Sequence, residues 1–292
     1  MEEQYRKTYR DAVYDEERAL YGLNHAQIVN CRFEGAQDGE SPLKECKRIR
    51  VDNCDFQLRY PLWHAHHATL TNCRMTQSCR AALWYDEQLA LRDCTLDGIK
   101  AMRECSGVSI LGGLARSSEF GWKCRDISIR DFALESEYPF LMTREMEVDQ
   151  LRMKAKYAFQ YVRNVTVRHS TLDTKDAFWH SENVTVSDSV IKGEYLGWYS
   201  RNLHLIRCRI IGTQPLCYCE GLVLQDCVME DTDLSFENSD VKATVRGEIM
   251  SVKNPRHGSI EAETIGVLIK DSHCLPDADC TITAHVIRHS TK

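Results

Sequence analysis

The sequence predicts an all-β fold, a single-stranded right-handed parallel β-helix with about 19 residues per coil. Three observations predict it. A phrase of the form apolar-x-apolar-x-x-Cys-x-apolar recurs along the chain, its copies become evenly spaced, and the 14 cysteines fall largely into the repeat, with no CxxC pair. A repeat of this length cannot bury its apolar face alone, so its copies must stack on one another as a solenoid.

The repeat defines columns of equivalent residues. Its first four copies end at Phe33, Phe56, Met75 and Leu96, and from Cys94 onward every step has the same length. Later copies keep the apolar positions and replace the cysteine. The cysteine position, taken as column zero, reads Cys31, Cys54, Cys73, Cys94, Gly113, Phe132, Leu151, Ser170, Ser189, Cys208 and Cys227.

Each coil is predicted to be strand, turn, strand. Before column zero, pairs such as Val165 with Val167 and Val184 with Val186 are separated by one polar residue, which indicates a strand with one buried face. An apolar residue two places after column zero marks the second strand. Left-handed β-helices use six-residue steps, and the constant step seen here is not a multiple of six, so the right-handed form is favoured.

The 292 residues are interpreted as one domain. Residues 1–22 are predicted to cap one end, residues 23–239 to form regular coils, and residues 240–292 to form irregular last coils and a closing cap. The last boundary is placed there because the phrase loosens after Met229. Caps are expected because open solenoid ends expose unpaired strands and core side chains.

Three segments resemble a known family. GESPLKE at 39–45, YPLWH at 60–64 and SVKNP at 251–255, together with the repeat, are similar to a bacterial family of unknown function with a pectin-lyase-like right-handed β-helix. The resemblance covers nearly the whole chain and implies the fold, but it carries no assigned catalytic residues. The superfamily includes polysaccharide lyases and glycosidases, which is an analogy of fold.

The composition excludes several classes of protein. With 43% hydrophobic and 27% charged residues the chain is neither disordered nor collagen-like, and no apolar run reaches the ~20 residues of a membrane span. A net charge of -6 argues against a nucleic-acid partner. Residues 1–18 lack the apolar core of a secretory signal, so a cytoplasmic location with reduced cysteines is expected. No cofactor is expected, and the long flat sides of a solenoid offer surfaces for homo-oligomers.

The aromatic residues point to carbohydrate. They occupy two neighbouring columns of the repeat, and strand alternation lets only one of the two columns face solvent. If the rings of a column are exposed, they would form a platform on which the sugar rings of an oligosaccharide stack. If they are buried in the core, they would need no ligand. The alternative is therefore a non-catalytic structural or interaction scaffold. The Trp column, ten residues before column zero, contains Trp63, Trp84, Trp122, Trp179 and Trp198. The next column, called the outer column below, contains His64, Tyr85, Tyr161, His180, Tyr199 and Tyr218.

A charged column lies three residues after the Trp column. Arg163, Glu182, Arg201 and Glu220 alternate in sign, as in a surface ion ladder. Arg125 and Arg144 do not alternate. They are candidates for binding an anion such as a uronate carboxylate, which the planar guanidinium matches.

Asp86 is unusual because its column otherwise holds small or apolar residues. Asp86 with Glu104, one coil further on, could form the carboxylate pair of a glycosidase, one as acid and one as base or nucleophile. The alternative is that both are solvated or cap turns. Lyase chemistry would need a base, for which Lys123 or Arg103 could serve.

The segment WHAHH at 63–67 carries a weak metal alternative. His64 and His66 are two residues apart, and Glu87 lies one coil further on, so the three could bind zinc with one position open. A histidine pair on a solvated strand needs no metal, and the overall expectation is that no metal is bound.

The cysteines are interpreted as small core residues, because serine and glycine replace them in other copies. Six stand in column zero. Cys46, Cys105, Cys124 and Cys219 share the small-residue column with Asp86. Cys79, Cys217, Cys274 and Cys280 have no assigned place in the repeat.

Overall fold

The computed structural model describes residues 5–35 and 40–289. Gly39, the first residue of a family-like segment, and residues 1–4 and 290–292 of the expected caps lie outside this part. The described residues contain strands and turns and no helix, and the strand pairings are parallel. The predicted fold class, a parallel β-helix with coils of about 19 residues, is confirmed. The chain divides into two compact units, residues 1–147 and 148–292.

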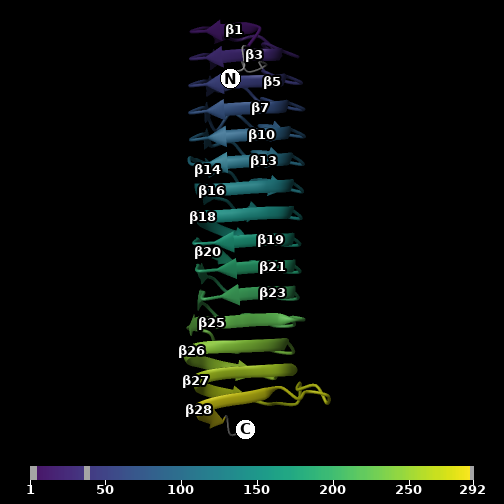
Figure 1. Cartoon of the computed structure of the whole chain (residues 1–292), viewed down its shortest axis with the longest axis vertical. Helices are drawn as coiled ribbons and strands as arrows, with labels where there is room; N and C mark the ends of the chain where they lie inside the picture. Colours follow the sequence, from purple (N-terminus) through teal and green to yellow (C-terminus); the bar gives the residue numbers. More distant parts are fainter. Residues whose placement is uncertain (1–4, 36–39, 290–292) are drawn as a thin grey trace. The chain divides into compact units, whose positions relative to one another are not determined.

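In unit 1, residues 1–147, each coil contributes a long strand that pairs in register with the next coil (Figure 1). The long strands are β1 (Lys7–Arg10), β3 (Asn24–Val29), β5 (Lys47–Asp52), β7 (His66–Thr71), β10 (Glu87–Arg92), β13 (Ser106–Leu111) and β16 (Arg125–Glu135). Short strands follow the corner: β2 (Val13–Tyr14), β4 (Arg32–Phe33), β6 (Asp55–Phe56), β8 (Arg74–Met75), β11 (Thr95–Leu96) and β14 (Leu114–Arg116). A separate four-stranded sheet comprises β9 (Leu83–Trp84), β12 (Met102–Arg103), β15 (Glu119–Trp122) and β17 (Tyr138–Pro139).

Unit 2, residues 148–292, repeats the same coil. The strand β18 (Arg144–Tyr157) contains the boundary between the units. The long strands of unit 2 are β19 (Arg163–Arg168), β21 (Glu182–Ser187), β23 (Arg201–Ile206) and β25 (Leu222–Glu230). Its short strands are β20 (Thr171–Lys175), β22 (Val190–Lys192) and β24 (Arg209–Ile211). The last coils use the long strands β26 (Asp240–Lys253), β27 (His257–Ile269) and β28 (Thr281–His289).

The terminal segments are more regular than the sequence predicts. Residues 7–14 contain β1 and β2, which pair in parallel with β3 and β4, so they belong to a coil. The strands β26, β27 and β28 also continue the parallel pairing. The phrase disappears at these ends for a physical reason: β1 is largely exposed, and the pairings β25–β26, β26–β27 and β27–β28 each contain a register shift.

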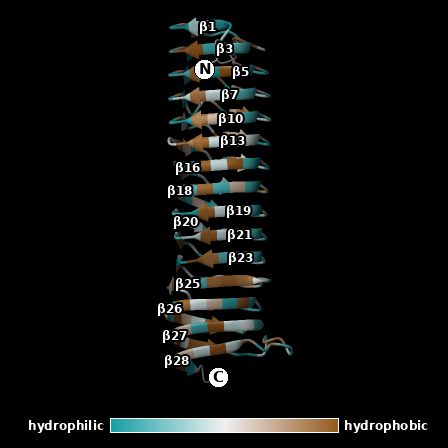
Figure 2. Cartoon of the chain, in the orientation of Figure 1, coloured by the Kyte–Doolittle hydropathy of each residue, from teal (hydrophilic) through white to brown (hydrophobic). Residues whose placement is uncertain are grey.

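The interior of each unit contains stacked apolar side chains. Buried and less buried residues alternate along the long strands, as in β7 and β10. Figure 2 shows hydrophobic and hydrophilic segments along these strands. Phe33 stacks on Phe56 with ring centroids 4.7 Å apart, and Phe159 stacks on Phe178 at 4.9 Å. All four rings are fully buried. Equivalent residues of neighbouring coils therefore form continuous core columns.

Column zero lies at the corner between the two strands, where its side chains supplement the backbone hydrogen bonds. The Cys73 thiol donates to the carbonyls of Val51 and Thr71, both at 3.4 Å. The Ser170 hydroxyl donates in the same way to the Arg168 carbonyl at 2.7 Å and accepts from the Leu151 N–H at 3.0 Å. Serine replaces cysteine here because both are small and both can make these bonds.

The small-residue column repeats this arrangement at a second corner. The Cys105 thiol donates to the Leu83 carbonyl at 3.1 Å, and the Cys105 N–H donates to Cys124 Sγ at 3.4 Å. All fourteen cysteines are free. Two of the unassigned ones, Cys79 and Cys217, are also buried, and burial raises the pKa of each thiol to about 12. These thiols therefore stay protonated at neutral pH.

Substitutions at Cys73 test this view of the corners. Cys73→Ser is expected to change the free energy of unfolding by less than about 1 kcal/mol, because the hydroxyl can make the same bonds. Cys73→Leu is expected to lose roughly 1–3 kcal/mol through overpacking. Denaturant titration of both variants measures the difference. Equal losses in both variants would contradict a corner that selects for size and hydrogen bonding.

Candidate functional site

The aromatic columns lie in turns in unit 2, whereas Trp84 and Trp122 of unit 1 are the last residues of the short strands β9 and β15. Residues 158–161, 177–180 and 196–199 are turn segments, and Phe178 and His180 both have left-handed backbone, with φ of 60° and 52°. The expectation that strand alternation hides one of the two columns was wrong, because a turn does not alternate. Both columns reach the surface, the Trp column half-buried and most of the outer column more exposed.

The Trp column is held by the protein itself. Each indole Nε1 donates to a backbone carbonyl of the following turn, at 2.5–2.8 Å. Trp63 stacks on Trp84 with centroids 5.4 Å apart, and Trp179 stacks on Trp198 at 5.5 Å. The indoles therefore have structural partners on their faces and on their nitrogens.

The outer column of unit 2 is a continuous stack of four rings. Centroids from Tyr161 to His180, to Tyr199 and to Tyr218 are 4.9, 5.0 and 4.9 Å apart, and the ring planes differ by only 8–12°. Tyr161 and Tyr199 are 47% and 44% exposed. His180 and Tyr199 have a ring on each face, so only their ring edges are exposed, whereas Tyr161 and Tyr218 are the end rings of the stack. A sugar cannot stack on the inner rings, so the expected platform is not formed there.

A cation replaces one ring of the Trp column in unit 1. The guanidinium carbon of Arg103 lies 5.1 Å from the Trp84 ring and 5.9 Å from the Trp122 ring. Its Nε pairs with Glu104 at 3.1 Å. Sequence reasoning considered Arg103 only as a base. Its place in the Trp column was the available signal, since guanidinium groups stack on aromatic faces.

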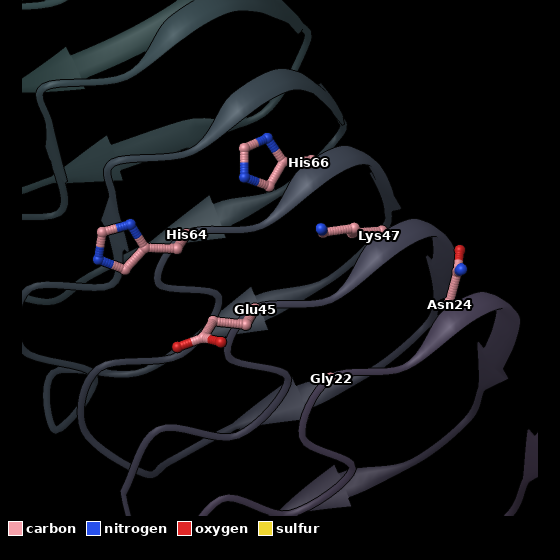
Figure 3. Close-up of a pocket in the computed structure, with 6 residues that line it drawn as sticks. All are labelled: Gly22, Asn24, Glu45, Lys47, His64 and His66. Carbon is pink, nitrogen blue, oxygen red and sulfur yellow. The ribbon is translucent and has the colours of Figure 1, made fainter.

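An open groove of about 590 Å³ lies beside the outer column in unit 1 (Figure 3). Figure 3 shows two rows of residues from successive coils. One row belongs to the outer column and the other to the charged column. The lining residues are Gly22, Glu45 and His64 in the first row and Asn24, Lys47 and His66 in the second. Sequence reasoning missed four of them, because the longer spacing from Cys31 to Cys54 hides the columns.

The groove combines an aromatic ring with hydrogen-bond acceptors and a hydrogen-bond donor. His64 stacks on Tyr85 at 5.0 Å, and within the described ranges no other ring stacks on it, so its second face is turned toward the coil of Glu45. Glu45 accepts a hydrogen bond from the Tyr21 hydroxyl at 2.6 Å. Lys47 makes no ion pair or hydrogen bond through its amine in the described part of the chain. The groove thus offers a ring face, acceptors and a free ammonium group.

The zinc alternative was wrong. His66 Nδ1 pairs with Glu87 at 3.2 Å, but His64 stacks on Tyr85. Figure 3 shows the two imidazoles in different rows of the groove. Among the residues that the structure describes, no group of three His, Cys, Asp or Glu side chains could hold a metal ion.

The glycosidase pair was also wrong. Asp86 is 0% exposed and points into the core, where its Oδ1 accepts the Ala65 N–H at 2.8 Å. Its Oδ2 has no partner in the described residues, and burial raises the pKa of this carboxyl well above its usual range. Glu104 is exposed and pairs with Arg103. The Asp86 carboxyl faces the core and the Glu104 carboxyl faces solvent, so the two cannot flank one glycosidic bond.

The charged column alternates where expected. Arg163 pairs with Glu182 at 3.3 Å, and Arg201 pairs with Glu220 at 3.1 Å. Arg125 and Arg144 are exposed and make no ion pair within the described residues.

With this geometry established, comparison with known proteins identifies the family. Residues 7–283 match the family described as "Protein of unknown function (DUF3737)". The chain belongs to the DUF3737 family. No curated protein matches this DUF3737 member. Within the described residues, no helix is long and apolar enough to cross a membrane.

Several solved structures are similar to this DUF3737 member at low sequence identity. The mannuronan C-5 epimerase AlgE6 A-module of Azotobacter vinelandii is 10% identical, with a TM-score of 0.49 over 82% of this chain and 88% of that chain. The surface protein and adhesin PfbA of Streptococcus pneumoniae is 8% identical, with a TM-score of 0.40 over 97% and 88%. A tailspike protein of E. coli bacteriophage HK620 is 9% identical, with a TM-score of 0.43 over 91% and 60%. Likeness at this level does not indicate a shared activity.

Proposed function

We propose that this protein binds a short oligosaccharide in the groove of unit 1. The observation that supports this most directly is that His64 stacks on Tyr85 with one face of its imidazole and has no ring on the other in the described residues, with a carboxylate and an ammonium group in the same groove. A sugar ring has apolar C–H faces and a rim of hydroxyls. It could lie against the imidazole while its hydroxyls bond to Glu45 and Lys47.

The size and composition of the groove agree with such a ligand. Its volume of about 590 Å³ lies within the range of roughly 300–1,000 Å³ that small-molecule sites occupy. The lining contains no aliphatic side chain, which disfavours a lipid or a purely apolar ligand. Asn24 accepts from Arg48 Nη2 at 2.7 Å, so part of the polar lining is already oriented.

Titration with a panel of neutral oligosaccharides, followed by ligand-observed NMR and calorimetry, tests the proposal. His64→Ala is expected to weaken binding about tenfold, because an aromatic contact and part of the groove wall are lost. His67→Ala is the matched control: it removes an exposed histidine of the same segment that does not line the groove, and it is expected to leave the affinity unchanged. Equal loss in both variants, or no binding by the wild type, would contradict the proposal.

A scaffold without a carbohydrate ligand is the second candidate. It is favoured by the bonded indole nitrogens and by the mutual coverage of the inner rings in the Tyr161 to Tyr218 stack. These contacts give the aromatic residues a structural role without any ligand. Absence of oligosaccharide binding in the same titration would favour this function.

A further inference from the structure

The charged column contains three successive arginines, Arg125, Arg144 and Arg163, of which only Arg163 makes an ion pair within the described residues. Elsewhere in this column, residues of opposite charge pair between neighbouring coils: Arg201 pairs with Glu220, and His66 pairs with Glu87 when the histidine is protonated. Arg125 N donates to the Cys105 carbonyl at 3.0 Å, and Arg144 N donates to the Cys124 carbonyl at 3.1 Å. The two arginines thus occupy equivalent positions one coil apart. Like charges placed this way repel each other.

A third cation lies in the outer column of the same coils. Lys123 is exposed, as are Arg125 and Arg144, and in the described part of the chain none of the three side chains makes an ion pair or a hydrogen bond. The acids nearest in sequence are Asp126, which follows Arg125, and Glu145, which follows Arg144. Glu104, which precedes Lys123 in the outer column, pairs with Arg103. Three cations that make no ion pair in the described part of the chain therefore lie at neighbouring positions of a protein whose net charge is -6.

The cations stand beside an apolar surface. Trp122 is half-buried and fixed, since its Nε1 donates to the Tyr138 carbonyl at 2.5 Å. Met142, in the outer column one coil after Lys123, is 49% exposed. Charges beside low-polarity groups attract a counter-ion more strongly than fully solvated charges do. A ligand with an anionic group and an apolar face would complement both parts of this surface.

We propose that Lys123, Arg125 and Arg144 form a binding site for a carboxylate or sulfate group. The planar guanidinium groups can donate two parallel N–H bonds to either anion, and the ammonium group supplies a point charge. The inference rests on the proposed function in one respect: the anion is assigned to a substituent of a bound oligosaccharide. The cation cluster then selects acidic over neutral sugars.

Calorimetry with three tetrasaccharides, one neutral, one carboxylated and one sulfated, tests whether the cation cluster selects acidic over neutral sugars. Glucuronate and inorganic sulfate are titrated separately as probes of the anion site alone. The wild type is expected to bind at least one acidic tetrasaccharide about tenfold more tightly than the neutral one at low ionic strength, and high salt is expected to remove this difference. The carboxylated and sulfated arms identify the preferred anion.

The double variant Arg125→Ala/Arg144→Ala is expected to bind acidic and neutral tetrasaccharides equally. The matched control is Arg163→Ala/Arg201→Ala, which removes two arginines of the same column that already have acidic partners. That control is expected to keep the tenfold preference. The cluster variant should unfold at the same denaturant concentration as the wild type or a higher one, because like-charge repulsion is removed.

The outcomes separate this inference from the proposed function. Equal affinity of the wild type for neutral and acidic tetrasaccharides, or a preference that survives Arg125→Ala/Arg144→Ala, overturns the anion site and leaves carbohydrate binding standing. Failure to bind any tetrasaccharide, with glucuronate or sulfate binding that the double variant loses, supports the anion site and overturns the proposed function.

Discussion

Replacing Asp86 with serine is expected to stabilise the protein at neutral pH by about 2 kcal/mol, the usual cost of a buried polar group that lacks a partner. Asp86 is 0% exposed, and one of its oxygens has no hydrogen-bond partner in the described residues. Serine stands at the equivalent position in other coils, and its hydroxyl can accept the Ala65 N–H in place of the carboxylate. Chemical denaturation at pH 7 measures the gain.

The gain should depend on pH in a defined direction. Burial raises the pKa of Asp86 in the folded protein, whereas the unfolded chain titrates near the ordinary value of about 3.9. Below about pH 4 both states are protonated. As the pH rises toward the folded pKa, the unfolded state releases its proton first, so the wild type loses stability. The advantage of Asp86→Ser should therefore grow as the pH is raised above about 4.

Two further variants make this prediction decisive. Asp86→Asn keeps an acceptor for the Ala65 N–H without a charge, so it should also remove the pH dependence. Asp173→Asn removes an exposed carboxylate and should change stability by less than about 0.5 kcal/mol. A loss of stability at pH 7 in both Asp86 variants would show that the ionised carboxylate has a partner.

Phe178→Ala is expected to destabilise the protein by roughly 3–5 kcal/mol, the cost of removing a fully buried aromatic side chain. The Phe178 ring is 0% exposed and stacks on Phe159 with centroids 4.9 Å apart and ring planes 8° from parallel. Alanine would leave a cavity in a core column whose backbone is fixed by strand pairing on either side. Equilibrium denaturation measures the loss.

Phe178→Leu is the matched control. Leucine fills the equivalent position in other coils, as at Leu62 and Leu216, both fully buried. The loss should therefore be well below that of Phe178→Ala. If alanine and leucine destabilised the protein equally, the stacked ring geometry, and not the filled volume, would be the source of stability.

The fold could be predicted because the repeat exposes it directly. Residues such as Val165 and Val167 recur at fixed positions in successive coils, and in-register stacking is the arrangement that buries all of these positions at once. The terminal coils could not be placed as well. Strand β1 is largely exposed, and β26 pairs with both of its neighbours through a register shift, so neither carries the periodic signal of the other coils.

The candidate site was only partly predictable. The columns that contain His64 and Arg125 were visible in the sequence, but whether a ring face is free depends on what occupies the next coil. His64 lies at the end of a stack because Glu45 occupies the same column one coil earlier, whereas His180 has a tyrosine on each side. The groove itself arises from two columns side by side, which no single column reveals.

The sequence by itself determined the coil length, the columns and the residues that share them, because a repeat period is a one-dimensional property. The tertiary structure decided which side chains point inward, which ring faces are covered and which charges have partners. Those outcomes depend on left-handed turn residues such as His64 and on the side chain one coil away. Asp86 shows the difference clearly: its column was known from the sequence, but its complete burial was visible only in three dimensions.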